Sequence, residues 1–241
     1  MLSKTQGIVL HATPYSDTRL IVHIYTEDYG RTSCIAARAK DRKNSLPKAL
    51  FTPLSIIEIE MEQKNGRDFA QLREVKLLYP FANLFADPVK NALALFVAEV
   101  LFRVVRETAP DRRLFAFLTR SIHVLEDTGN GIANFHLAFL LRLLAYLGIS
   151  PNADAYRDGV WFDMQDGVFV DTAPMHKHFL DKAESRILAR LLRISYENMS
   201  LYAFSRHQRI LILNKLITYY RLHLPEVPEI KSLPILQSLF D

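Results

Sequence analysis

A run of cationic side chains is the strongest candidate for chemistry in this sequence. The stretch from Ala37 to Lys48 carries five lysine or arginine residues and a single acid, Asp41. Cations at this density can neutralise phosphate groups, and the resulting affinity depends on salt and is largely blind to base sequence. The alternative is an ordinary solvated loop, because charged residues mostly lie on protein surfaces. The elements on either side of the stretch bear on this choice.

No catalytic or metal-binding motif competes with the basic stretch. The sequence has no P-loop, no glycine-rich dinucleotide turn, no G-x-S-x-G and no H-E-x-x-H. Cys34 is the single cysteine, which excludes an intrachain disulfide and any zinc site that needs two or more thiolates. His176 and His178 lack partners at metal-ligand spacing, and Asp163 with Asp166-Gly167 fits a hairpin turn better than a calcium loop. We therefore expect no enzyme activity, no catalytic residue, no metal and no cofactor.

Residues 1 to 80 predict a small β-barrel. Ile57, Ile59 and Met61 alternate with three glutamates, and this period of two is typical of a strand with one buried face. Asn65-Gly66 then predicts a hairpin, because both central positions of its turn tolerate positive φ. The strand-like segments are 7–13, 18–25, 32–39, 57–62 and 69–78. Five short antiparallel strands suit an OB-type barrel.

The position of the basic stretch favours a binding surface. It joins the third and fourth predicted strands, and OB folds commonly hold oligonucleotides on their sheet face and loops. Arg19 and Arg31 lie on neighbouring strands and could extend the same patch. Tyr15, Tyr25 and Tyr29 could stack on bases or pack within the protein.

Residues 81 to 241 predict an all-helical bundle domain. Asp87-Pro88 is typical of a helix start, with an N-cap followed by proline at the first helical position. Apolar residues at helical spacing predict helices over about 88–104, 111–129, 133–147, 181–193 and 200–223. Residues 151–178 form an acidic insert with a hairpin from Trp161 to Val170, and the proline-rich tail is expected to wrap the surface. The predicted fold is α+β, with an OB-type barrel followed by the helices.

The last long predicted helix carries a second group of cations. Arg206 and Arg209 are three residues apart and share a helix face, and no acid lies between Ser200 and Leu224. This pattern is compatible with a second basic patch and with a solvated helix face.

The charge balance and hydropathy are those of a soluble chain. The formal net charge is +4 and the sequence pI is about 9.1. No apolar segment is long enough to cross a membrane, and the first residues do not read as a secretory signal. We expect a cytoplasmic protein without a membrane partner.

Several short segments, taken in order, carry a family resemblance. They are Gly7-Ile8-Val9-Leu10, Tyr15-Ser16-Asp17, Tyr29-Gly30-Arg31, the run 37–40, the segment 54–60, the segment 139–144 with Leu147-Gly148, and Ile230-Lys231-Ser232. In their order and spacing the chain resembles the RecO-type DNA repair and recombination mediator proteins of bacteria, over nearly its whole length. The resemblance implies an OB barrel followed by a helical bundle, binding of single- and double-stranded DNA, and annealing of complementary strands. It also implies two partners, a RecR-type ring protein and single-strand-binding protein.

The same resemblance assigns functional residues. The DNA contacts map onto Arg38, Lys40, Arg42 and Lys43, with three further cations as neighbours, namely Arg19, Arg31 and Lys48. Arg142 matches a recurring arginine of the third helix, and it could receive the acidic C-terminal tail of single-strand-binding protein or pair within the bundle.

One feature departs from the family pattern. Many members carry four cysteines in two C-x-x-C pairs after the third helix, where they form a zinc site, whereas residues 152–174 here contain none. We expect no zinc, with Trp161, Phe162 and Phe169 packing in its place. The alternatives to a DNA-binding mediator are a non-catalytic protein-interaction scaffold and an RNA-binding OB protein.

Overall fold

The computed structural model describes residues 2–37, 48–63 and 69–239. The chain forms two compact units, of which the first contains the residues up to Asp127 together with Ile230–Leu239. The second unit is Thr128–Glu229. The first unit is therefore built from two segments of chain, and the second unit lies between them in sequence.

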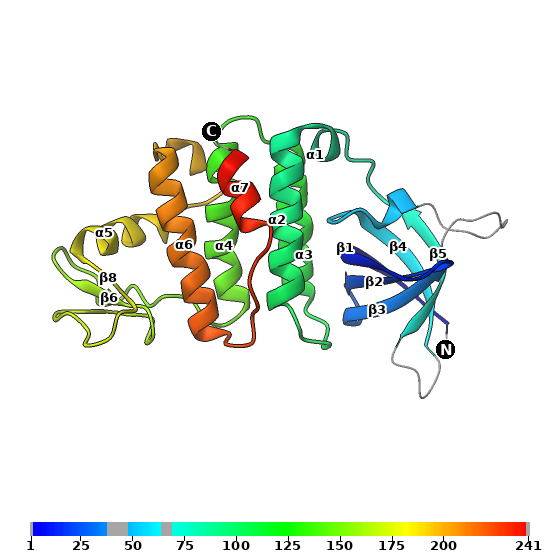
Figure 1. Cartoon of the computed structure of the whole chain (residues 1–241), viewed down its shortest axis with the longest axis horizontal. Coiled ribbons are helices and arrows are strands. Elements are labelled where there is room, and N and C mark those ends of the chain that lie inside the picture. The colour runs from blue at the N-terminus through cyan, green and yellow to red at the C-terminus, as the bar shows by residue number, and fades with distance from the viewer. Residues whose placement is uncertain (1, 38–47, 64–68, 240–241) are drawn as a thin grey trace. The chain divides into compact units, whose positions relative to one another are not determined.

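The first unit begins with a closed barrel of strands in the order β1-β2-β3-β5-β4 (Figure 1). The strands are β1 (Leu2–Ser16), β2 (Arg19–Thr26), β3 (Gly30–Ala37), β4 (Ile56–Glu62) and β5 (Ala70–Leu77), and a short 3-10 helix, η1 (Lys48–Phe51), precedes β4. This confirms the predicted OB-type barrel. One detail differs from the expected antiparallel arrangement, because β3 and β5 pair in parallel at Cys34 and Ile35 to close the barrel.

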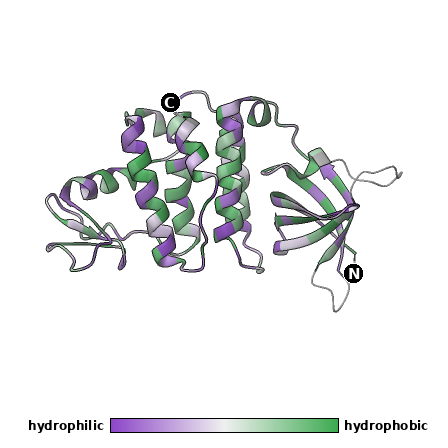
Figure 2. Ribbon diagram, in the orientation of Figure 1, coloured by the Kyte–Doolittle hydropathy of each residue, from purple (hydrophilic) through white to green (hydrophobic). Residues whose placement is uncertain are grey.

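Alternation of side chains builds the barrel core. Ile57, Ile59 and Met61 of β4 are buried, whereas the glutamates between them are half-buried. Val22 and Ile24 of β2 face the same interior. Figure 2 shows hydrophobic and hydrophilic residues mixed along the strands, as expected when one face of each strand is buried.

Three helices follow the barrel within the first unit: α1 (Asn83–Ala86), α2 (Pro88–Val104) and α3 (Arg112–Asp127). The predicted cap of α2 is confirmed, since Asp87 Oδ1 accepts from Val89 N at 2.8 Å and Lys90 N at 3.0 Å. The carboxylate of Glu126, near the end of α3, accepts from the backbone N–H groups at the start of α1. The barrel strands end at Leu77, and the predicted domain boundary at residue 80 stays a prediction.

The tail of the chain forms a helix rather than a surface wrap. Helix α7 (Leu233–Leu239) contacts α2, and Pro234 is its second residue, where a missing N–H does no harm. Glu99 of α2 holds the segment before it, because its carboxylate accepts from Lys231 N at 3.0 Å and from Ser232 N at 2.8 Å. Burial works against the ionised carboxylate, but these hydrogen bonds keep the pKa of Glu99 below its ordinary value. The Ile230-Lys231-Ser232 segment is thus an attachment to α2.

The second unit contains three longer helices and a small sheet. The helices are α4 (Phe135–Tyr146), α5 (Lys182–Leu191) and α6 (Arg206–His223), with short 3-10 turns η2 (Ile132–Asn134) and η3 (Met199–Leu201). The sheet has the order β7-β6-β8, from β6 (Trp161–Asp163), β7 (Val168–Val170) and β8 (Phe179–Leu180). The predicted hairpin is confirmed, and Gly167 at its turn has φ of +70°. None of the helices that the structure describes is long and apolar enough to span a bilayer.

Candidate nucleic-acid interface

The basic stretch connects the end of β3 to η1 along the sequence. Four of its cations lie outside the described residues: Arg38, Lys40, Arg42 and Lys43. Their part in binding stays a prediction. Lys48 is the first residue of η1, and Ala37, the last residue of β3, pairs with Arg19 of β2. The stretch therefore begins at the strand residue that pairs with Arg19.

Arg19 lies at this same end of the barrel. It is exposed, and it pairs with Ser16 of β1 as well as with Ala37 of β3. Among the described residues Arg19 has no acidic partner. Its guanidinium is therefore available for a phosphate, and its assignment as a DNA contact stays a prediction.

Arg31 lies in a different setting from Arg19. Its side chain is half-buried, and its Nη1 donates to the carbonyl oxygens of Phe102 and Val105, both at 2.9 Å. These carbonyls belong to the end of α2, where a helix leaves its last acceptors unpaired and favours a cation. The guanidinium also lies over the Phe102 ring, with Cζ 4.6 Å from the centroid. Arg31 joins the barrel to α2, and a role for it in DNA binding stays a prediction.

Gly30 completes this junction, which we call the barrel–helix seam and define as the contacts of β1–β3 with residues 102–115. Gly30 has φ of +59°, and a Cβ there would lie 2.5 Å from the Ala109 carbonyl oxygen. Glycine is needed because the backbone of the α2–α3 connection passes so close. Arg31 N donates to Glu107 O at 3.1 Å. The Tyr29-Gly30-Arg31 segment thus holds helices against the barrel.

Two histidine side chains pack against Phe102 at the seam. Phe102 lies with its ring centroid 4.9 Å from that of His11 and 5.0 Å from that of His23, and Ser33 Oγ is 2.8 Å from His23 Nδ1. Burial, with the nearby charge of Arg31, lowers the pKa of His23 to about 4. Burial likewise lowers the pKa of His136 in α4 to about 3. Both imidazoles are neutral in the folded protein at neutral pH.

The folded protein is expected to lose stability as the pH falls from about 6.5 to 4. An unfolded histidine binds its proton near pH 6.5, whereas folded His23 binds it only near pH 4, so protons favour the unfolded state across this window. With solvent screening at a half-buried group, the contribution of His23 is about 1–2 kcal/mol, fully present above pH 6.5. Urea unfolding at several pH values, for wild type and His23→Gln, measures it, and the variant should show the shallower decline.

His207→Gln is the matched control, because His207 is exposed at the start of α6. This variant should keep the wild-type pH dependence. Equal declines for wild type and His23→Gln would contradict the assignment of His23 as a neutral seam residue.

The two arginines of α6 differ in their surroundings. Helix α6 begins at Arg206 instead of near residue 200, because Ser205 and Gln208 form a capping box. Arg206 is exposed. Arg209 is half-buried, and its Nη1 donates to Phe204 O at 2.6 Å, on the chain just before the helix. Burial lowers the pKa of the Arg209 guanidinium. A second basic patch at these residues stays a prediction, and Arg206 is the better placed of the two for it.

Arg142 of α4 is exposed, and its guanidinium lies 5.8 Å from the ring centroid of Tyr196. This distance is within the range of a cation–π contact. No ion pair of Arg142 occurs among the described residues. Its charge remains accessible to an acidic group, and its role in partner binding stays a prediction.

The acidic insert is held by aromatic packing. Phe162 and Phe169 are buried with ring centroids 4.9 Å apart, and Trp161 meets Phe179 edge to face at 5.3 Å. Within residues 2–37, 48–63 and 69–239, no group of three or more His, Cys, Asp or Glu side chains could hold a metal ion. The absence of zinc from the protein stays a prediction.

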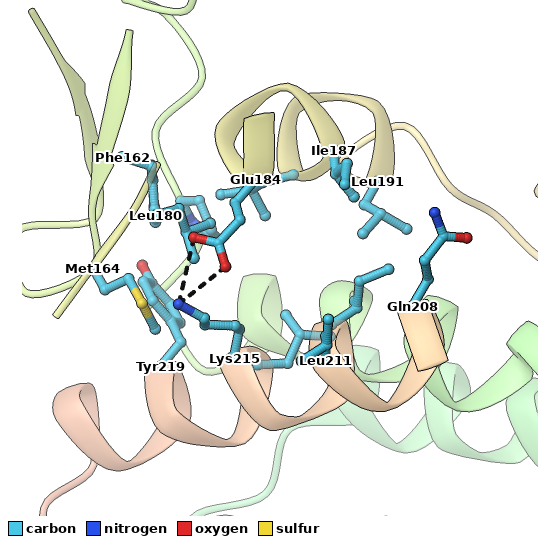
Figure 3. A pocket seen from close by; sticks show the side chains of 14 residues that line it. Phe162, Met164, Leu180, Glu184, Ile187, Leu191, Gln208, Leu211, Lys215 and Tyr219 are labelled. Carbon is cyan, nitrogen blue, oxygen red and sulfur yellow. Dashed lines mark hydrogen bonds and ion pairs between the residues drawn. The ribbon is translucent and has the colours of Figure 1, made fainter. Parts of the chain in front are cut away.

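A pocket in the second unit was not anticipated from the sequence (Figure 3). It lies between α5, α6 and the small sheet, and Lys215 pairs with Glu184 across it, with Nζ 3.2 Å from Oε1. The apolar lining residues are Pro151, Phe162, Met164, Leu180, Ile187, Leu188, Leu191, Leu211, Ile212, Leu216 and Tyr219. Such a lining suits an apolar side chain of a partner better than a reaction. The apolar spacing within α5 and within α6 could be recognised in the sequence, but the distance between the two helices could not.

Together, the barrel, the helices and the basic stretch define an OB-barrel protein with an appended helical region. Residues 1–81 match the family model described as "Recombination protein O N terminal", and residues 86–157 match "Recombination protein O C terminal". The chain is 41% identical over 241 residues to a protein of Azobacteroides pseudotrichonymphae and 43% identical over 240 residues to one of Phocaeicola vulgatus. A protein of Porphyromonas gingivalis is 38% identical over 245 residues. In each case the match covers all of both chains, and each relative is named "DNA repair protein RecO".

The chain belongs to the RecO family.

Proposed function

We propose that this chain is a DNA-binding recombination mediator and strand-annealing protein of recombinational repair. It acts with a RecR-type ring protein and with single-strand-binding protein, by binding and without a chemical step or a cofactor. The proposal implies a cytoplasmic protein. The observation that carries it is the full-length similarity to relatives named as DNA repair proteins.

The barrel supports the DNA-binding part of the proposal. OB barrels commonly bind oligonucleotides, and the most cationic stretch of this chain connects β3 to η1 and begins at Ala37, which pairs with the exposed Arg19. Two DNA strands repel each other through their phosphates. Cations that neutralise phosphates on both strands lower that repulsion, so complementary bases can meet.

The second unit supports the partner-binding part. Arg142 offers an accessible charge for the acidic tail of single-strand-binding protein, and the pocket between α5 and α6 offers an apolar surface for a protein side chain. A partner with a short acidic and apolar segment would use both kinds of contact.

Binding to a single-stranded oligonucleotide across a series of salt concentrations tests the proposal. We expect tight binding at about 50 mM salt and an affinity that falls steeply by 200 mM, with little dependence on base sequence. In the same conditions the protein should anneal two complementary oligonucleotides faster than they anneal alone.

The other two functions give different outcomes. An RNA-binding protein would prefer an RNA oligonucleotide to the DNA of the same sequence, since the 2′-hydroxyl distinguishes them. A scaffold would bind neither nucleic acid at low salt, and either result would overturn the proposed function.

A further inference from the structure

On the outer face of strands β1–β3, residues that pair across neighbouring strands form rows. Leu20, Val22 and Ile24 of β2 point into the barrel core, so the alternate residues of β2 point outward. The pairing of the strands then defines four outward rows: Tyr25 with Arg31; His11, His23 and Ser33; Thr13, Ile21 and Ile35; and Arg19 with Ala37.

Residues of the first two rows contact helices at the barrel–helix seam. Arg31 is bonded to the end of α2, and Tyr25 Oη is 3.4 Å from the carbonyl oxygen of Asp111 at the start of α3. Phe102 lies against His11 and His23. Helices of the same unit therefore contact half of the face on which an OB barrel ordinarily binds its ligand.

Among the described residues, those of the last two rows show no hydrogen bond or ring contact with a helix, and an exposed tyrosine follows them along β1. Thr13, Arg19 and Ala37 are exposed, and Ile21 and Ile35 are half-buried. Tyr15 is the extra residue of a bulge between Pro14 and Ser16, and it is 57% exposed. A bulge redirects the side chain that it carries, and one beside a binding surface is a common arrangement.

The half of the outer face that carries the last two rows combines an aromatic ring with a cation. Tyr15 and Arg19 are close neighbours, because Ser16, next to Tyr15, pairs with Arg19. An aromatic ring binds a base by stacking on its flat face, and this contact does not depend on base identity. In a duplex those flat faces are stacked within the helix, so only an unpaired base offers one. Arg19 can bind phosphate in either form of DNA.

We propose that this barrel binds single-stranded DNA in preference to double-stranded DNA, and that Tyr15 supplies the preference. The inference rests on the proposed function, because it concerns how the same DNA is bound. The ring stacks on an unpaired base over the open half of the face, while cations supply the affinity shared by both forms.

Affinities for a single-stranded oligonucleotide and for the same sequence as a duplex test this role, with the wild-type protein, Tyr15→Ala, Tyr15→Phe and Tyr15→Trp. We expect Tyr15→Ala to lower single-strand affinity by about 5- to 100-fold, the range for loss of one stacked base, and to leave duplex affinity within about twofold. The salt dependence should be unchanged, because no charge is removed. Phenylalanine should retain the preference, and tryptophan should retain or strengthen it.

Tyr29→Ala is the matched control. Tyr29 is 41% exposed and lies in the turn between Thr26 and Gly30, at the opposite end of β2 and β3 from Arg19 and Ala37. It should bind both forms as the wild type does. Equal losses for both DNA forms in Tyr15→Ala, or no loss for either, would overturn the role of Tyr15 and leave the proposed function intact. A wild-type protein that binds neither form would overturn both.

Discussion

Charge reversal in the basic stretch is expected to abolish most DNA binding. Arg38, Lys40, Arg42 and Lys43 changed together to glutamate should lower the affinity for single-stranded DNA by roughly 100-fold or more at about 0.1 M salt. Each lost phosphate contact on a single strand removes about 0.7 from the slope of log affinity against log salt, so four contacts remove about 3. Annealing should be lost with binding.

A charge-matched control separates this local effect from a general change in net charge. The second unit offers four exposed cations for the same replacement: Lys177, Lys182, Arg190 and Arg193. That variant should keep most of the affinity and nearly the wild-type salt slope. An unchanged affinity in a folded Arg38, Lys40, Arg42 and Lys43 variant would refute the assignment of the stretch as the DNA contact.

Gly30→Ala is expected to destabilise the first unit by about 2–5 kcal/mol. The left-handed conformation at φ of +59° costs a residue with a Cβ about 1–2 kcal/mol, and overpacking adds about 1–3 kcal/mol. The new Cβ would lie 2.5 Å from Ala109 O and 2.7 Å from Thr108 O, and both are backbone atoms that no rotamer change can move aside. Thermal unfolding followed by circular dichroism, with hydrogen exchange of β2 and β3, measures the loss.

Two other glycines separate the conformational cost from the cost of overpacking. Gly148 has φ of +71° and no atom within 4 Å of a Cβ, so Gly148→Ala should show only the conformational cost. Gly129 has open space where a Cβ would lie and a φ outside the left-handed region, so Gly129→Ala should stay within about 0.5 kcal/mol of wild type. If Gly30→Ala cost no more than Gly148→Ala, the close approach of the α2–α3 connection would not restrict residue 30.

The elements that the sequence predicted correctly are those set by local chemistry. The alternation at Ile57, Ile59 and Met61 depends on which face of one strand is buried, and the structure buries all three. The cap at Asp87 and the turn at Gly167 involve partners no more than four residues away. Each signal lies within a few neighbouring residues, so each could be recognised in the sequence.

The failures come from contacts between distant residues. The two carbonyls bonded by Arg31 lie 71 and 74 residues further along the chain, and Ser232 lies 133 residues from Glu99. Nothing in the letters around Arg31 distinguishes a cation held by a helix end from a cation in water. Helix α7 was missed because the prolines of the tail suggested irregular chain, although Pro234 stands where a helix tolerates it.

The features of the candidate site differ in the same way: those set by the local sequence could be predicted, and those set by distant contacts could not. The positive charge of the basic stretch and the exposure of Arg19 depend on composition and on one strand, and both were accessible from the sequence. The contact of Phe102 with half of the barrel face was not, because it requires α2 to dock on β1 and β2. The apolar pocket also depends on the spacing between α5, α6 and the small sheet.

The attachment of Ser232 to Glu99 has a consequence for synthesis. The first unit is complete only when α7 has docked on α2, yet the ribosome makes residues 128–229 between the two. Barrel and helices can form early, since domains fold as they emerge. Until α7 has been synthesised, the face of α2 that it will cover stays exposed. The nascent chain therefore exposes that apolar surface while the ribosome makes the entire second unit.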